Sequence, residues 1–96
     1  MSGRVKRCRL DGRQRTPAAI YDRLARDLEL PPHFGRNLDA LWDVLTTEVE
    51  GPVQIVWRLD PRLRAELGPF AEALLTLFTE VAREREDFTF TPITDP

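Results

Sequence analysis

Two aspartates one helical turn apart, Asp39 and Asp43, are the side chains of this sequence best suited to binding chemistry. Thr46 and Glu50 continue the series, so that all four residues would share one face of a helix. Carboxylates there can accept charge-assisted hydrogen bonds from arginine, lysine or histidine side chains. An acid in the first turn also interacts favourably with the helix dipole, and exposed carboxylates are often plain solvated surface. The spacing alone therefore leaves both a binding face and an ordinary surface open.

Catalysis by Asp39 and Asp43, as a general acid and base, is the first competing function. Nothing in the sequence buries one of them to raise its pKa, and no nucleophile or base lies near them in the sequence. The chain has one histidine, one cysteine, and neither a Gly-rich phosphate loop nor a His-Glu-x-x-His motif. The single Cys8 forms no internal disulfide, offers no metal cluster, and fits a small buried residue of a strand. We therefore expect neither an enzyme nor a cofactor.

A short helix must position the acidic face, and the sequence supplies its boundaries. Asn37 is a favoured N-cap residue, and Gly51-Pro52 ends the segment. Two prolines at positions 31–32 stop the preceding helix, and Gly35 gives the linking loop conformational freedom. An apolar stripe should bury the other side of the helix, and it consists of Leu38, Leu41, Trp42, Leu45 and Val49.

The other elements follow from alternation and from helix starts. Residues 5–10 and 88–91 alternate as strands, and residues 53–57 are typical of a buried strand. Three further helices should begin where a capping residue or a glycine precedes a proline, at Thr16-Pro17, Asp60-Pro61 and Gly68-Pro69. Residues 92–96 are expected to form a tail.

This order of strand, two helices, strand, two helices and strand favours a parallel sheet with right-handed crossovers. Each face of such a sheet normally needs a helical cover. We therefore expect an α/β fold in which a small three-stranded parallel sheet packs with about four helices. With 96 residues, the chain should form one domain, residues 1–96, with a core that needs neither disulfides nor metal. No apolar run approaches the roughly 18 residues of a membrane span, and no signal-peptide pattern is present, so we expect a cytoplasmic protein.

The charges are distributed unevenly along the chain. Residues 1–36 hold nine basic and four acidic side chains, whereas residues 37–96 hold five basic and twelve acidic ones. An acidic surface of this kind can steer a basic partner, or can simply aid solubility. The basic N-terminal third could contact nucleic-acid phosphates, which is the second competing function. No recognised nucleic-acid motif accompanies it, and arginines on an outer strand commonly protect a sheet edge.

Residues 28–46 read LELPPHFGRNLDALWDVLT and combine a proline-glycine loop, an asparagine cap and an amphipathic acidic helix. This run resembles the signature of the barstar family, the small intracellular inhibitors of secreted microbial ribonucleases. The match is nearly continuous over these residues, and it continues as a looser pattern whose best anchors are Pro52, Trp57, Phe78 and Glu80. The family has the same order of elements and the same architecture as those expected from the sequence.

The resemblance implies that this helix and its preceding loop plug the active site of a ribonuclease. The position of Asp43 would place a carboxylate where an RNA phosphate binds, and Asp39 would be a second acidic contact. Thr46 matches a polar contact position of the family, and Glu80 matches an acid on the last helix. Trp42 matches a tryptophan at the edge of the binding surface, although it could equally be a core residue. The full set of partner contacts implied in this way is His33, Phe34, Gly35, Asn37, Leu38, Asp39, Trp42, Asp43, Thr46 and Glu80.

Two positions depart from the best-known family member, which carries aromatic residues where this chain has His33 and Glu48. The resemblance also suggests a cis bond at Gly51-Pro52. It implies a monomer that binds a basic, extracellular, guanyl-preferring ribonuclease or a related toxin domain in a one-to-one complex. No membrane and no direct contact with nucleic acid is expected. The alternative is an immunity or regulatory domain of the same fold that binds a non-ribonuclease toxin or another protein.

Overall fold

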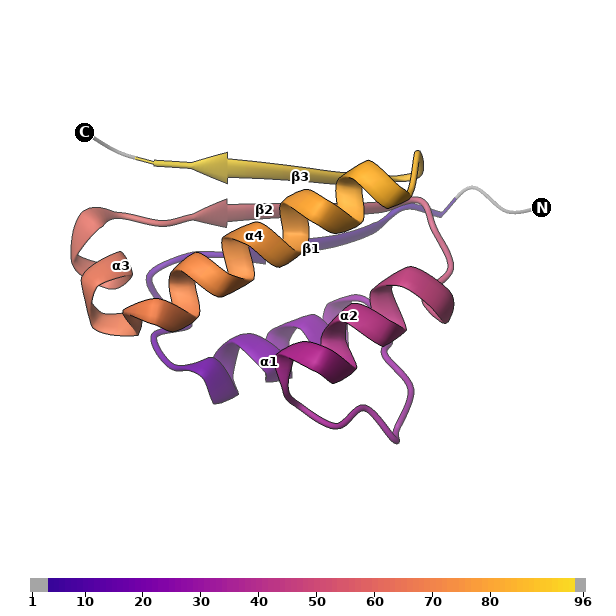
Figure 1. Cartoon of the computed structure of the whole chain (residues 1–96), viewed down its shortest axis with the longest axis horizontal. Helices are drawn as coiled ribbons and strands as arrows, with labels where there is room; N and C mark the ends of the chain where they lie inside the picture. The colour runs from indigo at the N-terminus through magenta and orange to yellow at the C-terminus, as the bar shows by residue number, and fades with distance from the viewer. Residues whose placement is uncertain (1–3, 95–96) are drawn as a thin grey trace.

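The computed structural model describes residues 4–94 and contains a parallel sheet whose strand order is β1-β2-β3. The strands are β1 (Lys6–Leu10), β2 (Val53–Arg58) and β3 (Phe88–Ile93). Two helices follow each of the first two strands (Figure 1), and they are α1 (Pro17–Asp27), α2 (Leu38–Thr47), α3 (Pro61–Leu67) and α4 (Pro69–Glu84). The predicted α/β architecture, with three parallel strands and four helices, is therefore confirmed.

Side-chain caps start three of the helices at the predicted residues. Thr16 accepts a hydrogen bond from the backbone N–H of Ala19 at 3.1 Å, and Asp60 accepts one from Leu63 at 2.8 Å. In both helices a proline occupies the first turn, where its missing N–H costs nothing. Asn37 caps α2 in the same way.

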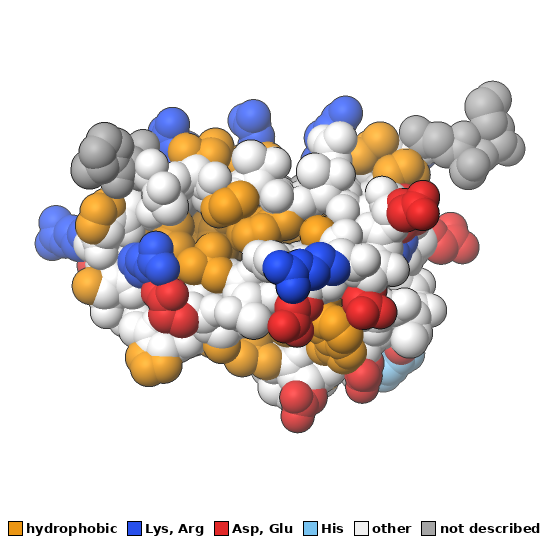
Figure 2. All heavy atoms as spheres, turned by 45° about the horizontal axis from the view of Figure 1, so that its top comes forward, with side chains coloured by type: hydrophobic (Ala, Val, Ile, Leu, Met, Phe, Trp, Pro, Cys, Tyr) orange, Lys and Arg blue, Asp and Glu red, His pale blue; other side chains and the backbone are white. Residues whose placement is uncertain are grey.

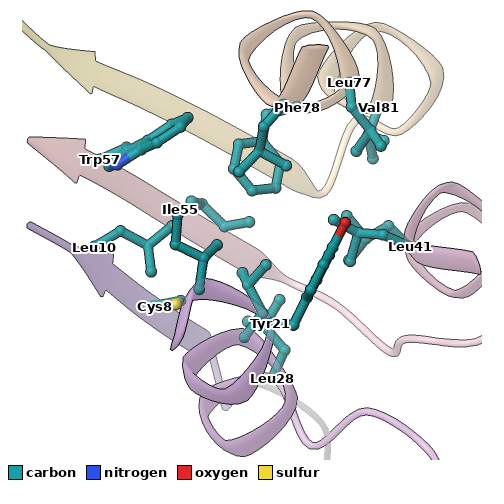
Figure 3. Packing of buried hydrophobic residues seen from close by; sticks show 14 of the residues in the cluster. Cys8, Leu10, Tyr21, Leu28, Leu41, Ile55, Trp57, Leu77, Phe78 and Val81 are labelled. Atoms are coloured by element: carbon teal, nitrogen blue, oxygen red, sulfur yellow. The ribbon is translucent and has the colours of Figure 1, made fainter. Parts of the chain in front are cut away.

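The helices bury one face of the sheet. Along β2 the burial alternates, so that Val53, Ile55 and Trp57 are buried while Gln54 and Arg58 are exposed. Figure 3 shows the strand residues Cys8, Leu10, Ile55 and Trp57 together with residues of the helices in one cluster. Within that cluster the rings of Trp57 and Phe78 meet edge to face, with their centroids 6.3 Å apart. The core therefore lies between the sheet and the helices.

The opposite face of the sheet has no helical cover, so the expectation that helices would cover both faces was wrong. Because strand order follows chain order, two crossovers of the same hand place all their helices on the same side. The residues that point to the open side alternate with the buried ones and are mostly exposed, namely Arg7, Arg9, Gln54, Val56, Arg58, Thr89, Thr91 and Ile93. Of these, Val56 alone is half-buried. Residues 53–57 are thus a strand buried on one side only.

The last strand is longer than the sequence suggested. Pro92 and Ile93, predicted as part of a tail, pair with Trp57 and Arg58 of β2. Proline is acceptable there because β3 is an edge strand, so its missing N–H breaks no ladder on the outer side. The Gly51-Pro52 bond that leads into β2 is cis, as the resemblance suggested. Among the described residues, no helix is long and apolar enough to cross a membrane.

Candidate partner-binding surface

The loop before α2 is held by the side chain of Asn37. Its Oδ1 accepts a hydrogen bond from the backbone N–H of Ala40 at 2.8 Å, and its Nδ2 donates to the carbonyl oxygen of Gly35 at 3.3 Å. Gly35 packs closely here, since an added Cβ would lie 3.3 Å from the Cβ of Ala40. Asn37 and Gly35, both expected among the partner contacts, are exposed and also shape the loop.

The acidic face of α2 is on the surface. Asp39 and Asp43 are exposed, and α2 has no basic residue in its last turn. The opposite side of the helix enters the core through Leu41, Val44 and Leu45, of which Val44 was absent from the predicted stripe. Leu38 and Trp42 are partly buried against the core, so each can pack inward and still present part of its surface outward.

Two threonine hydroxyls bond to the backbone in the second half of α2. Thr46 donates to the carbonyl oxygen of Trp42 at 2.7 Å, and Thr47 donates to that of Asp43 at 2.6 Å. The hydroxyl proton of Thr46 is therefore used within the helix, while its oxygen lone pairs stay available as acceptors. Asp39, Asp43 and Thr46 together form a surface that accepts hydrogen bonds from donors on a partner.

A distant arginine completes the C-terminal end of α2. Arg85, the residue after α4, donates from Nη1 to the carbonyl oxygens of Leu45 and Val49 at 2.8 and 2.9 Å. Its Nε and Nη2 donate to both carboxylate oxygens of Asp87, each at 2.9 Å. Arg85 thus provides the positive charge that α2 lacks in its own last turn. Sequence reasoning missed this contact.

The two departures from the family pattern lie next to each other. Nε2 of His33, in the loop, is 3.2 Å from Oε1 of Glu48 at the end of α2. Both side chains are largely exposed. Because a neutral histidine can donate one hydrogen bond and a charged one can form an ion pair, Glu48 can hold His33 on the surface in either state. The pair therefore forms one edge of the acidic face.

Phe34 differs from the other expected contacts because it is only 9% exposed. Its ring lies edge to face against Tyr21 of α1, with the centroids 5.8 Å apart. This placement gives Phe34 the role of anchoring the loop to the core. A direct contact of Phe34 with a partner stays a prediction.

A shallow cleft beside the N-terminal end of α2 was also missed. Pro17, Tyr21 and Phe70 contribute apolar lining, and the site residues Asn37, Leu38 and Asp39 line it together with Arg36. Arg36 has a positive φ of 54° and forms an ion pair with Asp22 of α1. Because this ion pair holds Arg36 toward α1, its positive charge lies at the rim of the acidic face.

Glu80 lies on α4, which packs against α2, and it is exposed. It borders a hollow that Arg64, Glu72 and Arg83 also line, so its surroundings carry both signs of charge. Arg64 donates to both carboxylate oxygens of Glu72, at 2.6 and 2.7 Å, and these bonds lower the pKa of Glu72. Arg64 is therefore already paired, which leaves Glu80 as an acceptor on the helical side of the molecule.

The charges of the surface are unevenly placed in space as well as in sequence. Figure 2 shows several Asp and Glu side chains gathered in the lower part of the view, whereas Lys and Arg side chains project along its upper edge. Over residues 4–94, no group of three or more His, Cys, Asp or Glu side chains is arranged to hold a metal ion. What the described surface of α2 offers is a set of hydrogen-bond acceptors on a capped helix.

Two proteins or families with a known description are similar to this chain in sequence. The sequence model of the family described as "Barstar (barnase inhibitor)" matches residues 5–93. The protein named "Putative ribonuclease inhibitor YrdF" from Bacillus subtilis (strain 168) is 35% identical over 79 residues, which cover 81% of this chain and 87% of that protein. The chain belongs to the barstar family of ribonuclease inhibitors.

Proposed function

We propose that this protein inhibits a secreted, barnase-like ribonuclease by covering its active site with the acidic face of α2 and the loop before it. The observation that carries the proposal is the exposure of Asp39 and Asp43 on a helix without a basic residue. Two fixed points, the Asn37 cap and the Arg85 contacts, hold this helix in place. The family membership supports the same role.

The proposed mechanism is mimicry of the charge of the substrate. A ribonuclease holds an RNA phosphate with cationic side chains, and the carboxylate of Asp43 would accept hydrogen bonds from the same donors. Asp39 and the hydroxyl oxygen of Thr46, one turn to either side, would accept further bonds. Since α2 is preorganised by its cap and by Arg85, little conformational entropy should be lost on binding. No bond is made or broken, so the protein acts as a blocker and not as an enzyme.

The expected complex is one to one, with a cytoplasmic monomer as the free state. A standard interface would cover about 800 Å² of this chain. Residues 33–46 would supply its centre, and Glu80 would contribute from the neighbouring helix. His33 and Glu48 replace aromatic residues of the best-known family member, which favours a target enzyme with a different surface at that edge.

A titration of ribonuclease activity tests the proposal. Increasing amounts of the protein are added to a fixed amount of a barnase-like ribonuclease, and cleavage of a fluorogenic oligonucleotide is followed. A linear loss of activity that ends at one equivalent, and that a substrate-analogue nucleotide relieves competitively, supports occlusion of the active site. Full activity at a large excess of folded protein against several such enzymes would favour the alternative, in which the same fold binds a non-ribonuclease toxin.

A further inference from the structure

The open face of the sheet carries an ordered array of polar and cationic side chains. The register sets them in rows across the three strands. One row consists of Arg7, Gln54 and Thr89, and the next consists of Arg9, Val56 and Thr91. A third pairs Arg58 with Ile93. Because residues two apart on a strand lie roughly 7 Å apart on one face, the three arginines form a connected basic patch.

Two of these arginines are available to a ligand. Within residues 4–94, Arg9 and Arg58 form no ion pair, while Arg7 donates from Nε to the side-chain oxygen of Gln54 at 3.1 Å. Arg9 and Arg58 line a hollow at the C-terminal ends of β1 and β2 together with Asp11, Val56 and Ile93. Asp11, the acid at its rim, already accepts a hydrogen bond from the backbone N–H of Arg13 at 2.9 Å. A hydrogen bond leaves the negative charge of Asp11 in place, so the hollow presents two guanidinium groups and one carboxylate.

The chemistry of this face fits a phosphate backbone better than a protein. A protein interface is centred on desolvated apolar and aromatic residues, whereas Val56 and Ile93 are the only apolar open-face side chains within β1, β2 and β3. Interfaces with nucleic acids are more polar and more positively charged. Guanidinium groups bind phosphate oxygens in a bidentate manner, and the hydroxyls of Thr89 and Thr91 are additional donors. Since Arg7, Arg9, Gln54, Val56, Arg58, Thr89, Thr91 and Ile93 include no aromatic residue, stacking of bases on aromatic rings would contribute nothing.

Although the family resemblance implies no direct contact with nucleic acid, we propose that the open sheet face is a second binding surface, which holds the phosphate backbone of RNA without regard to base sequence through Arg7, Arg9 and Arg58. The phosphate contact follows from the charges of the face. The choice of RNA rests on the proposed function, in which the target enzyme acts on RNA. All helices pack on the other side of the sheet, so RNA on this face leaves the acidic face of α2 free. A ribonuclease that reaches the same RNA would then meet a raised local concentration of inhibitor.

Fluorescence anisotropy with a labelled RNA hairpin, in low salt and without ribonuclease, tests this surface. The variant Arg9→Ala/Arg58→Ala removes two proposed phosphate contacts. Arg26→Ala/Arg62→Ala is the matched control, because it removes the same charge from two exposed arginines of α1 and α3. We expect the first variant to weaken RNA binding at least about tenfold and to lower the slope of log K against log salt by about 2. The control should bind within about twofold of the wild type.

Three results would overturn the proposal. The first is that the wild type shows no salt-dependent binding of RNA. The second is that both double variants lose the same amount of RNA affinity. The third is that polyglutamate displaces the labelled RNA as strongly as unlabelled RNA of equal charge does. Stronger binding of a DNA hairpin would exclude RNA as the preferred occupant. Thermal melting of both variants checks that they fold. Inhibition of the ribonuclease is measured separately, so a failure of the proposed function with intact RNA binding is distinguishable from a failure of this surface.

Discussion

The guanidinium of Arg85 donates to the carbonyl oxygen of Val49 at 2.9 Å, which ties the end of α4 to the segment that follows α2. The same nitrogen also bonds to the carbonyl oxygen of Leu45. The two residues Arg85 and Val49 are 36 positions apart, so the contact exists only in the folded chain. It connects the stability of the fold with the position of the acidic face, because both depend on where α2 ends.

Arg85→Ala should destabilise the protein by about 2 kcal/mol, since charge-assisted hydrogen bonds typically contribute about 1.5–3 kcal/mol. The Arg85 side chain is only 15% exposed, so water replaces its bonds poorly. Urea unfolding of the variant should show a lower midpoint with an unchanged slope. The control is Arg83→Ala, which removes an exposed arginine two residues before Arg85, in the last turn of α4. It should leave the midpoint almost unchanged.

Gly51 lies against the Arg85–Asp87 ion pair, and a Cβ there would overlap Oδ2 of Asp87 and lie 2.7 Å from Nη2 of Arg85. Gly51→Ala should therefore push the pair apart, and because both groups are the ends of flexible side chains the loss of stability should be at the low end of overpacking, about 1 kcal/mol. In the Arg85→Ala background the same substitution should cost less, because the pair is already broken. Additive losses in the double variant would show that the clash does not act through Arg85.

Asp27, at the end of α1, makes stability depend on pH in the acid range. Burial opposes its ionisation, but hydrogen bonds from Arg23 and Arg26 outweigh burial and lower its pKa from the ordinary value of 3.8. A carboxyl whose pKa is lower in the folded than in the unfolded chain stabilises the fold fully at pH values above its unfolded pKa. This contribution is lost as the pH falls through the pKa of the folded state. Asp27→Asn should thus lower stability at neutral pH and flatten its decline below about pH 4. An unchanged acid profile would contradict this assignment.

Cys8 should be unreactive while the protein is folded. Burial raises the pKa of its thiol to about 12, and the charge of Asp27 adds to the effect. Because the thiolate is the reactive form, iodoacetamide at pH 8 should modify the folded protein at least about a hundredfold more slowly than the protein in guanidinium. The rate of labelling, followed by mass spectrometry, measures this. Fast labelling of the folded state would mean that the β1 edge opens readily.

Local signals in the sequence were sufficient to predict which segments form helices and which form strands. Thr16, Asn37 and Asp60 were predicted as caps and act as caps, because this interaction reaches only three residues along the chain. The strand and helix order then fixed the parallel sheet. The acidic positions Asp39 and Asp43 were predicted to lie on the surface, and they do, because helical spacing separates them from the apolar stripe.

Features that depend on tertiary contacts were not predicted. The contact of Arg85 with α2 and the ion pair of Arg36 with Asp22 join distant parts of the chain. The open sheet face was missed for another reason, because parallel strands usually have helices on both sides. The sequence nevertheless contained a pattern that indicates an exposed sheet face, since Gln54 and Arg58 alternate with the apolar residues of β2. That alternation is typical of a strand with one face in water.

The central claim is that the acidic face of α2 binds the ribonuclease, and Asp43→Ala tests it most directly. Glu86→Ala, which removes an exposed carboxylate from the turn before β3, is the control. Inhibition constants are measured for wild type and both variants, with thermal melting to confirm that each is folded. We expect Asp43→Ala to weaken inhibition at least about thirtyfold, which corresponds to about 2 kcal/mol, while Glu86→Ala stays within about twofold of the wild type. Equal inhibition by wild type and Asp43→Ala would contradict the account.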